Sequence, residues 1–408
     1  MSVLPYGVDS KMDLDLPPEV MLSPRVGPCG HPLSDVASAI NSALSSPLDF
    51  PAVERMVVPG DKVTLALSAG LAQAPILVRS VINRLTSAGI TLEDITVLRP
   101  PLDAVRGREN PYDELSSIFP DNVTFLTHDP KKQTNLAHLG ISPYRHPVYL
   151  NRALVEADVV ILLGAMQLES TLAYHGILAS LYPTYADEPV LRRFRSPKAI
   201  GRGDTCDHRI GDEVEMINRQ LGVRFTVQIV PGLGEEIVHV LAGDIDAVAA
   251  QGQSLCQATW SFDVPRRATL VVATISGPAW NQTWENVGCA LSNAMAVVEE
   301  SGAVVICTDL EQPLAPGMQA IADHDDPQDA VPWIRRTRPV DIAPAIALTQ
   351  LLSHARVYLL SNQDESLVED LGMAVVGDAS EVARLASRHA SCVLLADAHR
   401  MSVRVVEV

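Results

Sequence analysis

The stretch VVILLG, residues 159–164, is an unbroken apolar run that follows the polar turn at residues 156–158. A short run of branched aliphatic residues is typical of a strand that is buried on both faces of a parallel sheet. The residues just before the turn, 152–156, have the pattern of a short helix. The stretch therefore predicts a central strand of an α/β protein.

Strands and helices alternate toward the N-terminus of this run. Residues 63–67 and 94–98 are predicted strands, and residues 123–128 form another. The apolar spacing of residues 75–88 predicts a helix that ends at Gly89. Strand–helix–strand units make right-handed crossovers, so a mostly parallel sheet follows.

The same alternation returns in the second half of the chain. Residues 225–229 and 245–259 are a predicted strand and helix, and residues 261–267 are a predicted linker. A helix at 285–299 and several strands follow, namely 270–274, 303–307, 357–360, 374–376, 393–396 and 403–408. The expected fold class is α/β, with two lobes that each hold a mostly parallel, Rossmann-like sheet flanked by helices, and a cleft between them.

The length of 408 residues exceeds one ordinary core, so two domains are expected, at residues 1–265 and 266–399. The first 50 residues, rich in Pro and Gly, are predicted to be an irregular, partly stranded arm that leads to a helix at 33–44. Residues 324–339 are predicted to be an insertion loop with a short helix.

The net charge of the chain makes some classes of binding partner unexpected. With 31 basic and 49 acidic residues, the formal net charge is −18. Such a surface repels nucleic-acid phosphates and anionic lipids, so neither nucleic acid nor membrane is an expected partner. A small anionic substrate or ligand would need a local basic pocket. The sequence leaves the oligomeric state open.

The cysteines and the N-terminus predict a cytoplasmic protein. The six cysteines are scattered and form no CxxC pair, which is typical of reduced thiols. The N-terminus has no apolar signal region, and no run of about 18 apolar residues predicts a membrane span.

Several short segments, in the same order along the chain, resemble the lactate racemase family, whose members use a nickel-pincer nucleotide. They include Leu4-Pro5-Tyr6-Gly7, Val58-Pro59-Gly60-Asp61-Lys62-Val63, Ala242-Gly243-Asp244, Ser276-Gly277-Pro278 and Asp397-Ala398-His399. The likeness covers nearly the whole chain. It implies that the final strand, at about 400–408, returns to the first lobe. It also implies an isomerase, a racemase or epimerase of small 2-hydroxy acids.

The residues that the resemblance implies for the first-lobe site are mostly replaced. The family's D-x-T-R-P loop reads Ser68-Ala69-Gly70-Leu71-Ala72 here, which leaves Gly70 and Ala72 as a bare backbone anion site. The next loop keeps Arg99 but has no histidine.

The later family positions also differ. A family histidine five residues after Gly164 corresponds to Glu169, and the lysine that attaches the cofactor corresponds to Ala179. The nickel-binding histidine corresponds to Arg195, and a substrate-contacting Q-x-x-K pair corresponds to Asn286 and Cys289. No metal site is expected from this set.

Two residues are candidates for acid–base catalysis. Glu169 follows the carboxyl end of a buried strand, where α/β ligand sites gather, and burial would raise its pKa. His175 lies in the same loop and is the candidate to replace a lost histidine. The alternatives are a helix-start carboxylate for Glu169 and a solvated loop position for His175.

The candidates for substrate binding are Trp280, Gln282, Asn286 and Arg99, and Arg195 is a candidate for the cofactor. Trp280 and Trp284 either stack on a ligand or pack in the core. The basic run around Arg195 binds an anion or forms a solvated helix face.

Another polar cluster contains Asp204, Cys206 and His208. These residue types suit a metal or a nucleophile, but a surface loop is the expected structure.

Three functions remain open from the sequence. The first is a 2-hydroxy-acid racemase or epimerase with an altered active site. The second is a catalytically inactive family member that binds a small anion or a partner protein. The third is a different enzyme that uses Glu169 and His175 as an acid–base pair.

Overall fold

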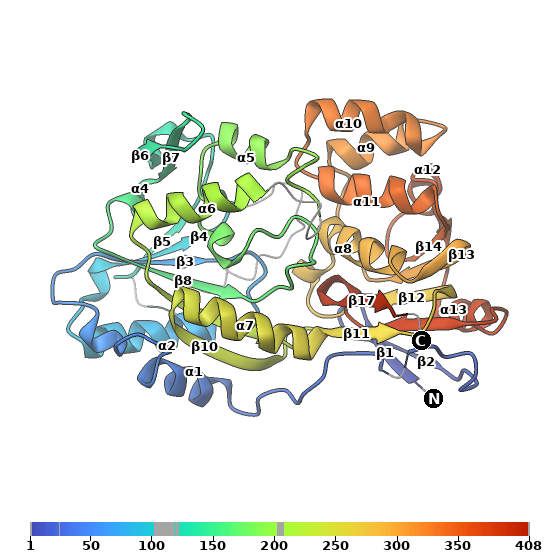
Figure 1. The fold of residues 1–408 in the computed structure, drawn as a ribbon, viewed down its shortest axis with the longest axis horizontal. Coiled ribbons are helices and arrows are strands. Elements are labelled where there is room, and N and C mark those ends of the chain that lie inside the picture. Colours follow the sequence, from blue (N-terminus) through green and yellow to red (C-terminus); the bar gives the residue numbers. More distant parts are fainter. Residues whose placement is uncertain (1, 24, 102–118, 120–121, 202–207, 407–408) are drawn as a thin grey trace.

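The computed structural model describes residues 2–23, 25–101, 119, 122–201 and 208–406. Two lobes lie side by side, each built on a sheet with helices packed against it (Figure 1). The expected α/β class with two mostly parallel sheets is confirmed. No helix among these residues is long and apolar enough to cross a membrane.

The first lobe contains a six-stranded sheet in the order β10-β9-β8-β3-β4-β5, in which only β10 is antiparallel to its neighbour. The predicted central strand is β8 (Val159–Ala165), which pairs with β3 and β9. The other strands are β3 (Val63–Leu67), β4 (Ile95–Arg99), β5 (Thr124–Thr127), β9 (Phe225–Pro231) and β10 (Ile237–Asp244).

Alternate side chains of β8 face opposite layers of this lobe. Ile161 and Leu163 pack in one apolar cluster with α1 (Val36–Ser45) and α2 (Ala74–Ser87). Leu162, by contrast, packs in a second cluster that includes Leu154 and Tyr185. Both faces of the strand are therefore buried from solvent, which explains why its sequence is continuously apolar.

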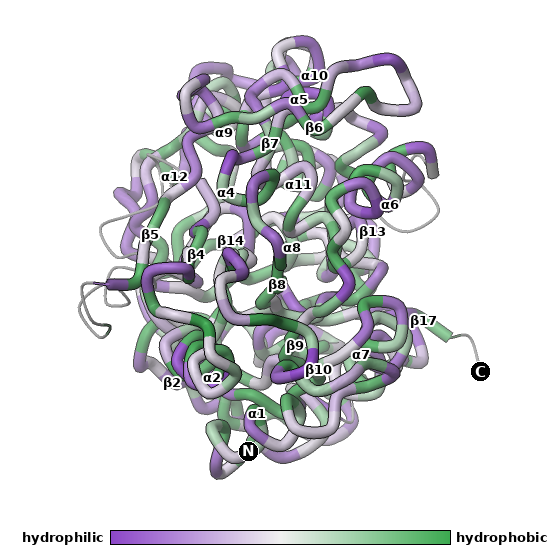
Figure 2. Tube along the Cα trace, turned by 90° about the vertical axis from the view of Figure 1, so that its left-hand side faces the viewer, coloured by the Kyte–Doolittle hydropathy of each residue, from purple (hydrophilic) through white to green (hydrophobic). Residues whose placement is uncertain are grey.

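Further elements complete the first lobe. They are β6 (Leu136–Ile141), β7 (Pro147–Asn151), α4 (Arg152–Val155), η4 (Ile177–Ser180), α5 (Glu188–Phe194), α6 (His208–Leu221) and α7 (Ile245–Trp260). The labelled helices α6 and α7 each carry both hydrophilic and hydrophobic residues (Figure 2).

The second lobe contains a five-stranded parallel sheet in the order β15-β14-β13-β12-β16. Its strands are β12 (Ala268–Thr274), β13 (Val298–Cys307), β14 (Arg356–Leu360), β15 (Ala374–Val375) and β16 (Cys392–Leu395). Its helices are α8 (Trp284–Met295), α9 (Pro316–Ala322), α10 (Val331–Thr337), α11 (Ile342–Leu352), α12 (Glu365–Asp370) and α13 (Ala379–Ala386).

The N-terminal arm is an ordered hairpin of β1 (Ser2–Tyr6) and β2 (Ser10–Leu14). Leu4, Met12 and Leu14 are buried in a cluster with residues of the second sheet. The arm therefore packs on the second lobe, although it precedes the first lobe in the sequence. The expected division of the chain at residue 265 stays a prediction.

The final strand β17 (Ser402–Val405) runs parallel to β11 (Ser261–Val264) and pairs with it. The segment expected to be a linker is therefore a strand. One further expectation needs correction. The helix predicted at 285–299 ends at Met295, because Val298 starts β13 and pairs with Ala268. The short helix expected within residues 324–339 is α10, and the 3-10 helix η7 (Pro327–Ala330) precedes it, so helix occupies more of this segment than expected.

Candidate functional site

A cavity of ≈ 250 Å³ lies between the two lobes. Its first-lobe wall includes Gly70 after β3, Gln167 after β8, and Pro231 at the end of β9. Its second-lobe wall includes the start of α8 and the short helix η8 (Ala398–Arg400). The carboxyl ends of parallel strands thus open toward the cavity, which is the usual ligand position in α/β folds.

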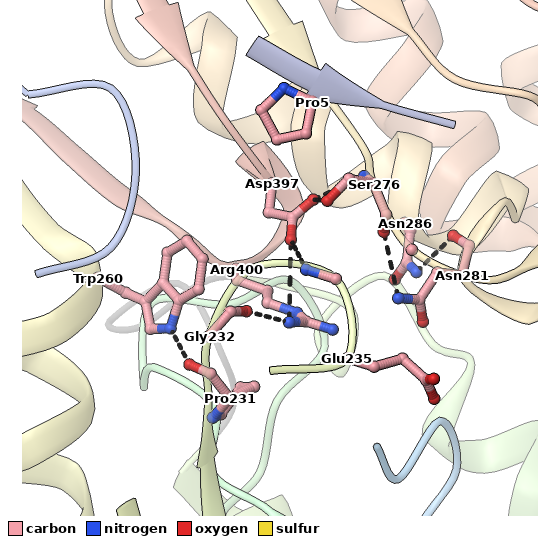
Figure 3. A network of polar contacts seen from close by, with 12 residues as sticks. Pro5, Pro231, Gly232, Glu235, Trp260, Ser276, Asn281, Asn286, Asp397 and Arg400 are labelled. Atoms are coloured by element: carbon pink, nitrogen blue, oxygen red, sulfur yellow. Dashed lines mark hydrogen bonds and ion pairs between the residues drawn. The ribbon is translucent and has the colours of Figure 1, made fainter. Parts of the chain in front are cut away.

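Arg400 is the only permanent cation among the described residues that line the cavity. Its side chain is 13% exposed, and its guanidinium donates a hydrogen bond to the carbonyl of Gly232. Burial lowers the pKa of Arg400, while Asp397 and Glu235 oppose that shift. An arginine stays protonated at neutral pH under such conditions. Figure 3 shows that the terminal nitrogen of Arg400 that does not bind Gly232 points away from Asp397.

Asp397 joins the two lobes beside Arg400. Its carboxylate is fully buried and accepts hydrogen bonds from the Ser276 amide at 2.6 Å and the Ser276 hydroxyl at 2.8 Å. It also accepts one from the Gly234 amide, at 2.7 Å, in the turn between β9 and β10 of the first lobe (Figure 3). Its backbone is left-handed, with φ 54°. A single carboxylate therefore fixes the turn of one lobe to the first strand end of the other.

The two lobes also touch through glycines at this point. A Cβ atom on Gly277 would lie 3.0 Å from the Cα atom of Gly234, and both residues have positive φ, 102° and 55°. A larger residue at Gly277 would crowd the backbone of Gly234, and the positive φ of both residues favours glycine.

Two buried side-chain atoms of residues that line the cavity have no hydrogen-bond partner in the described structure. One is Nδ1 of His399, whose side chain is buried and whose pKa is lowered by that burial to about 3. The other is Oε2 of Glu285, in the first turn of α8. Both residues line the cavity. At neutral pH the imidazole of His399 is uncharged.

Two cysteines line the cavity from opposite lobes, Cys256 on α7 and Cys289 on α8. Burial raises the pKa of Cys256 to about 12, so its sulfur is a thiol rather than a nucleophilic thiolate. Within the described residues, no group of three His, Cys, Asp or Glu side chains is arranged to hold a metal ion.

Four of the predicted site residues line this cavity: Gly70, Ala72, Trp280 and Asn286. The Asn286 amide donates to the carbonyl of Asn281 at 2.8 Å, which fixes its orientation. Trp284 does not face the cavity. It is buried, and its indole N–H donates to the carbonyl of Gln312 at 3.0 Å.

The predicted acid–base pair does not line the cavity among the described residues. Glu169 is exposed, so the burial expected from the sequence is not found. The ring of His175 packs edge-on against Phe194, with centroids 5.8 Å apart. Burial lowers the pKa of His175, partly offset by a hydrogen bond to the backbone of Ala199.

The remaining candidates have other surroundings. Gln282 is buried, with its amide donating to the carbonyl of Gly277 at 2.9 Å and its oxygen accepting from Thr308 at 2.6 Å. Arg195 is ion-paired with Glu188 at 3.0 Å. Arg99 ends β4, and the described lining residues include neither arginine.

The polar cluster of the sequence lies mostly outside the described residues. This applies to Asp204, Cys206 and the side chain of His208.

Sequence reasoning missed Arg400, Asp397, His399 and Glu285 as site residues. One signal was present, because three polar residues, Asp397, His399 and Arg400, stand within five residues of the end of the apolar strand β16. Polar residues at the carboxyl end of a parallel strand are candidates for a ligand site.

Comparisons with known proteins agree with this fold. The family model for the lactate racemase N-terminal domain matches residues 6–193. The lactate racemase apoprotein from Thermoanaerobacterium thermosaccharolyticum is similar in structure, with a TM-score of 0.78 and 17% identity, over 98% of this chain and 99% of that one. A protein from Thermotoga maritima matches with a TM-score of 0.68 and 15% identity, over 92% of this chain and 99% of that one. No curated protein matches significantly in sequence.

Proposed function

Because the chain belongs to the lactate racemase family, through its lactate racemase N-terminal domain, we propose that it binds a small 2-hydroxy acid in the cavity between its lobes. The observation that carries the proposal is the guanidinium of Arg400 on the cavity wall. Arginine is well suited to a carboxylate, because it offers several N–H donors in one plane.

One terminal nitrogen of the Arg400 guanidinium donates to the carbonyl of Gly232, and the other points away from Asp397. The nearest oxygen of Asp397 is 3.9 Å away, too far for a hydrogen bond. Hydrogen bonds from Ser276 and Gly234 already occupy that carboxylate. Asp397 therefore orients the guanidinium electrostatically without consuming its donors. The volume of ≈ 250 Å³ suits a ligand of a few heavy atoms.

The nickel-pincer nucleotide of the family does not fit the residues present. Where the resemblance places the cofactor-attaching lysine, Ala179 packs against an apolar cluster. Where it places a nickel-binding histidine, Arg195 is paired with Glu188. Neither side chain offers a group that would bond the cofactor or its metal. We therefore assign no step of a reaction to this cofactor.

Racemase or epimerase activity on the same acid is the second candidate. The observation in its favour is that His399 and Glu285, both able to exchange protons, line the cavity. Inversion at C2 requires a hydrogen to leave one face of the carbon and return to the other. A histidine with a pKa near 3 is a weak base at neutral pH, so binding without turnover is the primary proposal.

Calorimetric titration with lactate tests the proposal. The Arg400→Gln variant is expected to bind at least about tenfold more weakly, because a charged hydrogen bond contributes about 1.5–3 kcal/mol. The matched control is Arg404→Gln, whose side chain is 65% exposed on β17. Equal affinity of the Arg400→Gln variant and the native protein would refute the site. Chiral chromatography of L-lactate after incubation detects the second candidate as formation of the D enantiomer.

A further inference from the structure

The chain has four tryptophans, and Trp280 differs from the other three. Trp260 and Trp284 are buried in one large apolar cluster, and Trp333 packs against the same cluster. Trp280 is half-buried and belongs to none of the apolar clusters formed by the described residues. Its ring also contacts no other aromatic ring and no cation among those residues. The indole of Trp280 is therefore not used to build the core of either lobe.

Trp280 instead lines the cavity between the lobes, from the short helix η6 (Ala279–Asn281) that precedes α8. Two apolar residues of the first lobe line the same cavity, Ala165 at the end of β8 and Leu172 in the segment that follows it. All three keep part of their surface exposed to solvent. Both lobes therefore offer apolar surface to a ligand, and covering such surface favours binding.

The charges on the cavity wall limit the rest of the ligand. Arg400 is the only permanent cation among the described lining residues, and the proposed function assigns it to the carboxylate of the ligand. Glu285 is an acidic residue that lines the same cavity. A second carboxylate on the ligand would lack a cation among these residues and would be repelled by Glu285. The side chain of the ligand is therefore expected to be uncharged.

We propose that the cavity prefers 2-hydroxy acids whose side chain is apolar and larger than a methyl group, and that Trp280 covers this side chain. The inference rests on the proposed function, in which Arg400 holds the carboxylate. It adds the class of side chain and makes Trp280 a residue that determines specificity. An indole suits this role, because it offers a large, rigid apolar face and loses little conformational entropy when a ligand covers it.

The test compares lactate, 2-hydroxy-4-methylpentanoate and malate by calorimetry on the full-length protein. Each methylene group that moves from water to an apolar site tightens binding by about fourfold, so 2-hydroxy-4-methylpentanoate should bind at least about tenfold more tightly than lactate. Malate has as many heavy atoms as 2-hydroxy-4-methylpentanoate but carries a second carboxylate. It should bind at least about tenfold more weakly than that acid.

The Trp280→Ala variant isolates the residue responsible. The ratio of the lactate to the 2-hydroxy-4-methylpentanoate dissociation constant should fall by at least about fivefold, because the apolar face is removed. Trp280→Phe keeps an aromatic face and should retain most of the preference. Trp333→Ala is the matched control, since Trp333 is a half-buried tryptophan of the same lobe that is not among the described lining residues. Thermal melts establish that each variant is folded.

Tryptophan fluorescence provides an independent measurement. The emission of the native protein should change when 2-hydroxy-4-methylpentanoate is added, because its side chain covers the indole of Trp280. The change should be absent in Trp280→Phe and present in Trp333→Phe. The same change in the native protein and in Trp280→Phe would contradict the contact.

The outcomes separate this inference from the proposed function. If the three acids bind equally and Arg400→Gln weakens all of them, the preference for an apolar side chain is refuted and the carboxylate site stands. If Trp280→Ala keeps the native ratio of dissociation constants, Trp280 does not determine specificity and the inference fails. If none of the acids binds the native protein, the proposed function fails as well.

Discussion

The protonation state of a single residue of the site, His399, depends on its burial. Burial lowers its pKa from 6.5 to about 3, so the folded protein holds the imidazole neutral over a range in which the unfolded chain protonates it. Below pH 6.5 the unfolded state therefore binds more protons than the folded state. By linkage, this difference favours unfolding as the pH falls.

The pH dependence of stability tests this assignment. Between about pH 6 and pH 4, His399 is expected to remove about 1.4 kcal/mol of unfolding free energy for each unit of decrease in pH. Urea titrations of the native protein and His399→Gln at several pH values measure the slope. The variant should have the shallower slope over this window. Identical slopes would show that His399 is not held neutral.

The residue scale is also where sequence reasoning was least complete. Glu169 and His175 follow the central strand, and this position correctly predicts the end of the sheet at which the cavity lies. Local sequence does not reveal whether a loop side chain turns inward, and Glu169 is exposed. Arg400 was missed because its partner Gly232 is 168 positions away along the chain. Such a contact exists only once both lobes are folded.

At the scale of the elements, one carboxylate holds three segments together. Asp397 follows β16, receives the amide of Ser276 after β12, and receives the amide of Gly234 between β9 and β10. These segments belong to both lobes, and Arg400 follows three residues later. The position of the cationic group is therefore coupled to the contact between the lobes.

Replacing Asp397 by Asn tests this coupling. Asn tolerates the left-handed backbone and keeps one carbonyl oxygen, so the change removes mainly the charge and one acceptor. The variant should lose about 3 kcal/mol of unfolding free energy, because a buried charged partner of Arg400 is removed. Denaturant titration measures this loss.

The control for this change is Asp263→Asn, in the exposed pair with Arg404. An exposed pair contributes about 0–1 kcal/mol, so the control should be nearly neutral. Equal effects of the two changes would contradict a special role for Asp397.

Elements with strong periodicity could be predicted from the sequence, and elements decided by distant partners could not. The apolar run of β8 and the amphipathic α2 are local signals, and both are present as expected. The strand β13 begins at Val298-Glu299-Glu300, where the two glutamates favour a helix. Its pairing with β12 overrides that preference.

At the scale of the whole molecule, the N-terminal hairpin belongs to the second lobe. Leu14 is fully buried against the second sheet, whereas Val3 on the same hairpin is 54% exposed. The chain therefore begins on the second lobe, then forms the first lobe, and then returns to form the rest of the second lobe. The packing of this arm on the second lobe could not be predicted from its sequence, which is rich in Pro and Gly. The residues that bury it lie more than 250 positions later in the chain.

The two alanine variants of these residues measure the contribution of the hairpin. Leu14→Ala is expected to lower the unfolding free energy by about 2–5 kcal/mol, because it removes buried methyl groups and leaves a cavity. Val3→Ala should change it by less than about 0.5 kcal/mol. Chemical denaturation followed by circular dichroism provides both values. A small effect of Leu14→Ala would show that the arm is dispensable.

The chain is strongly acidic, so the functional account depends on Arg400, the arginine that lines the cavity among the described residues. The most direct measurement is a crystal structure determined with L-lactate at saturating concentration. We predict density for the carboxylate within hydrogen-bonding distance of the Arg400 guanidinium. Lactate bound elsewhere, or a cavity without lactate at that concentration, would contradict the account.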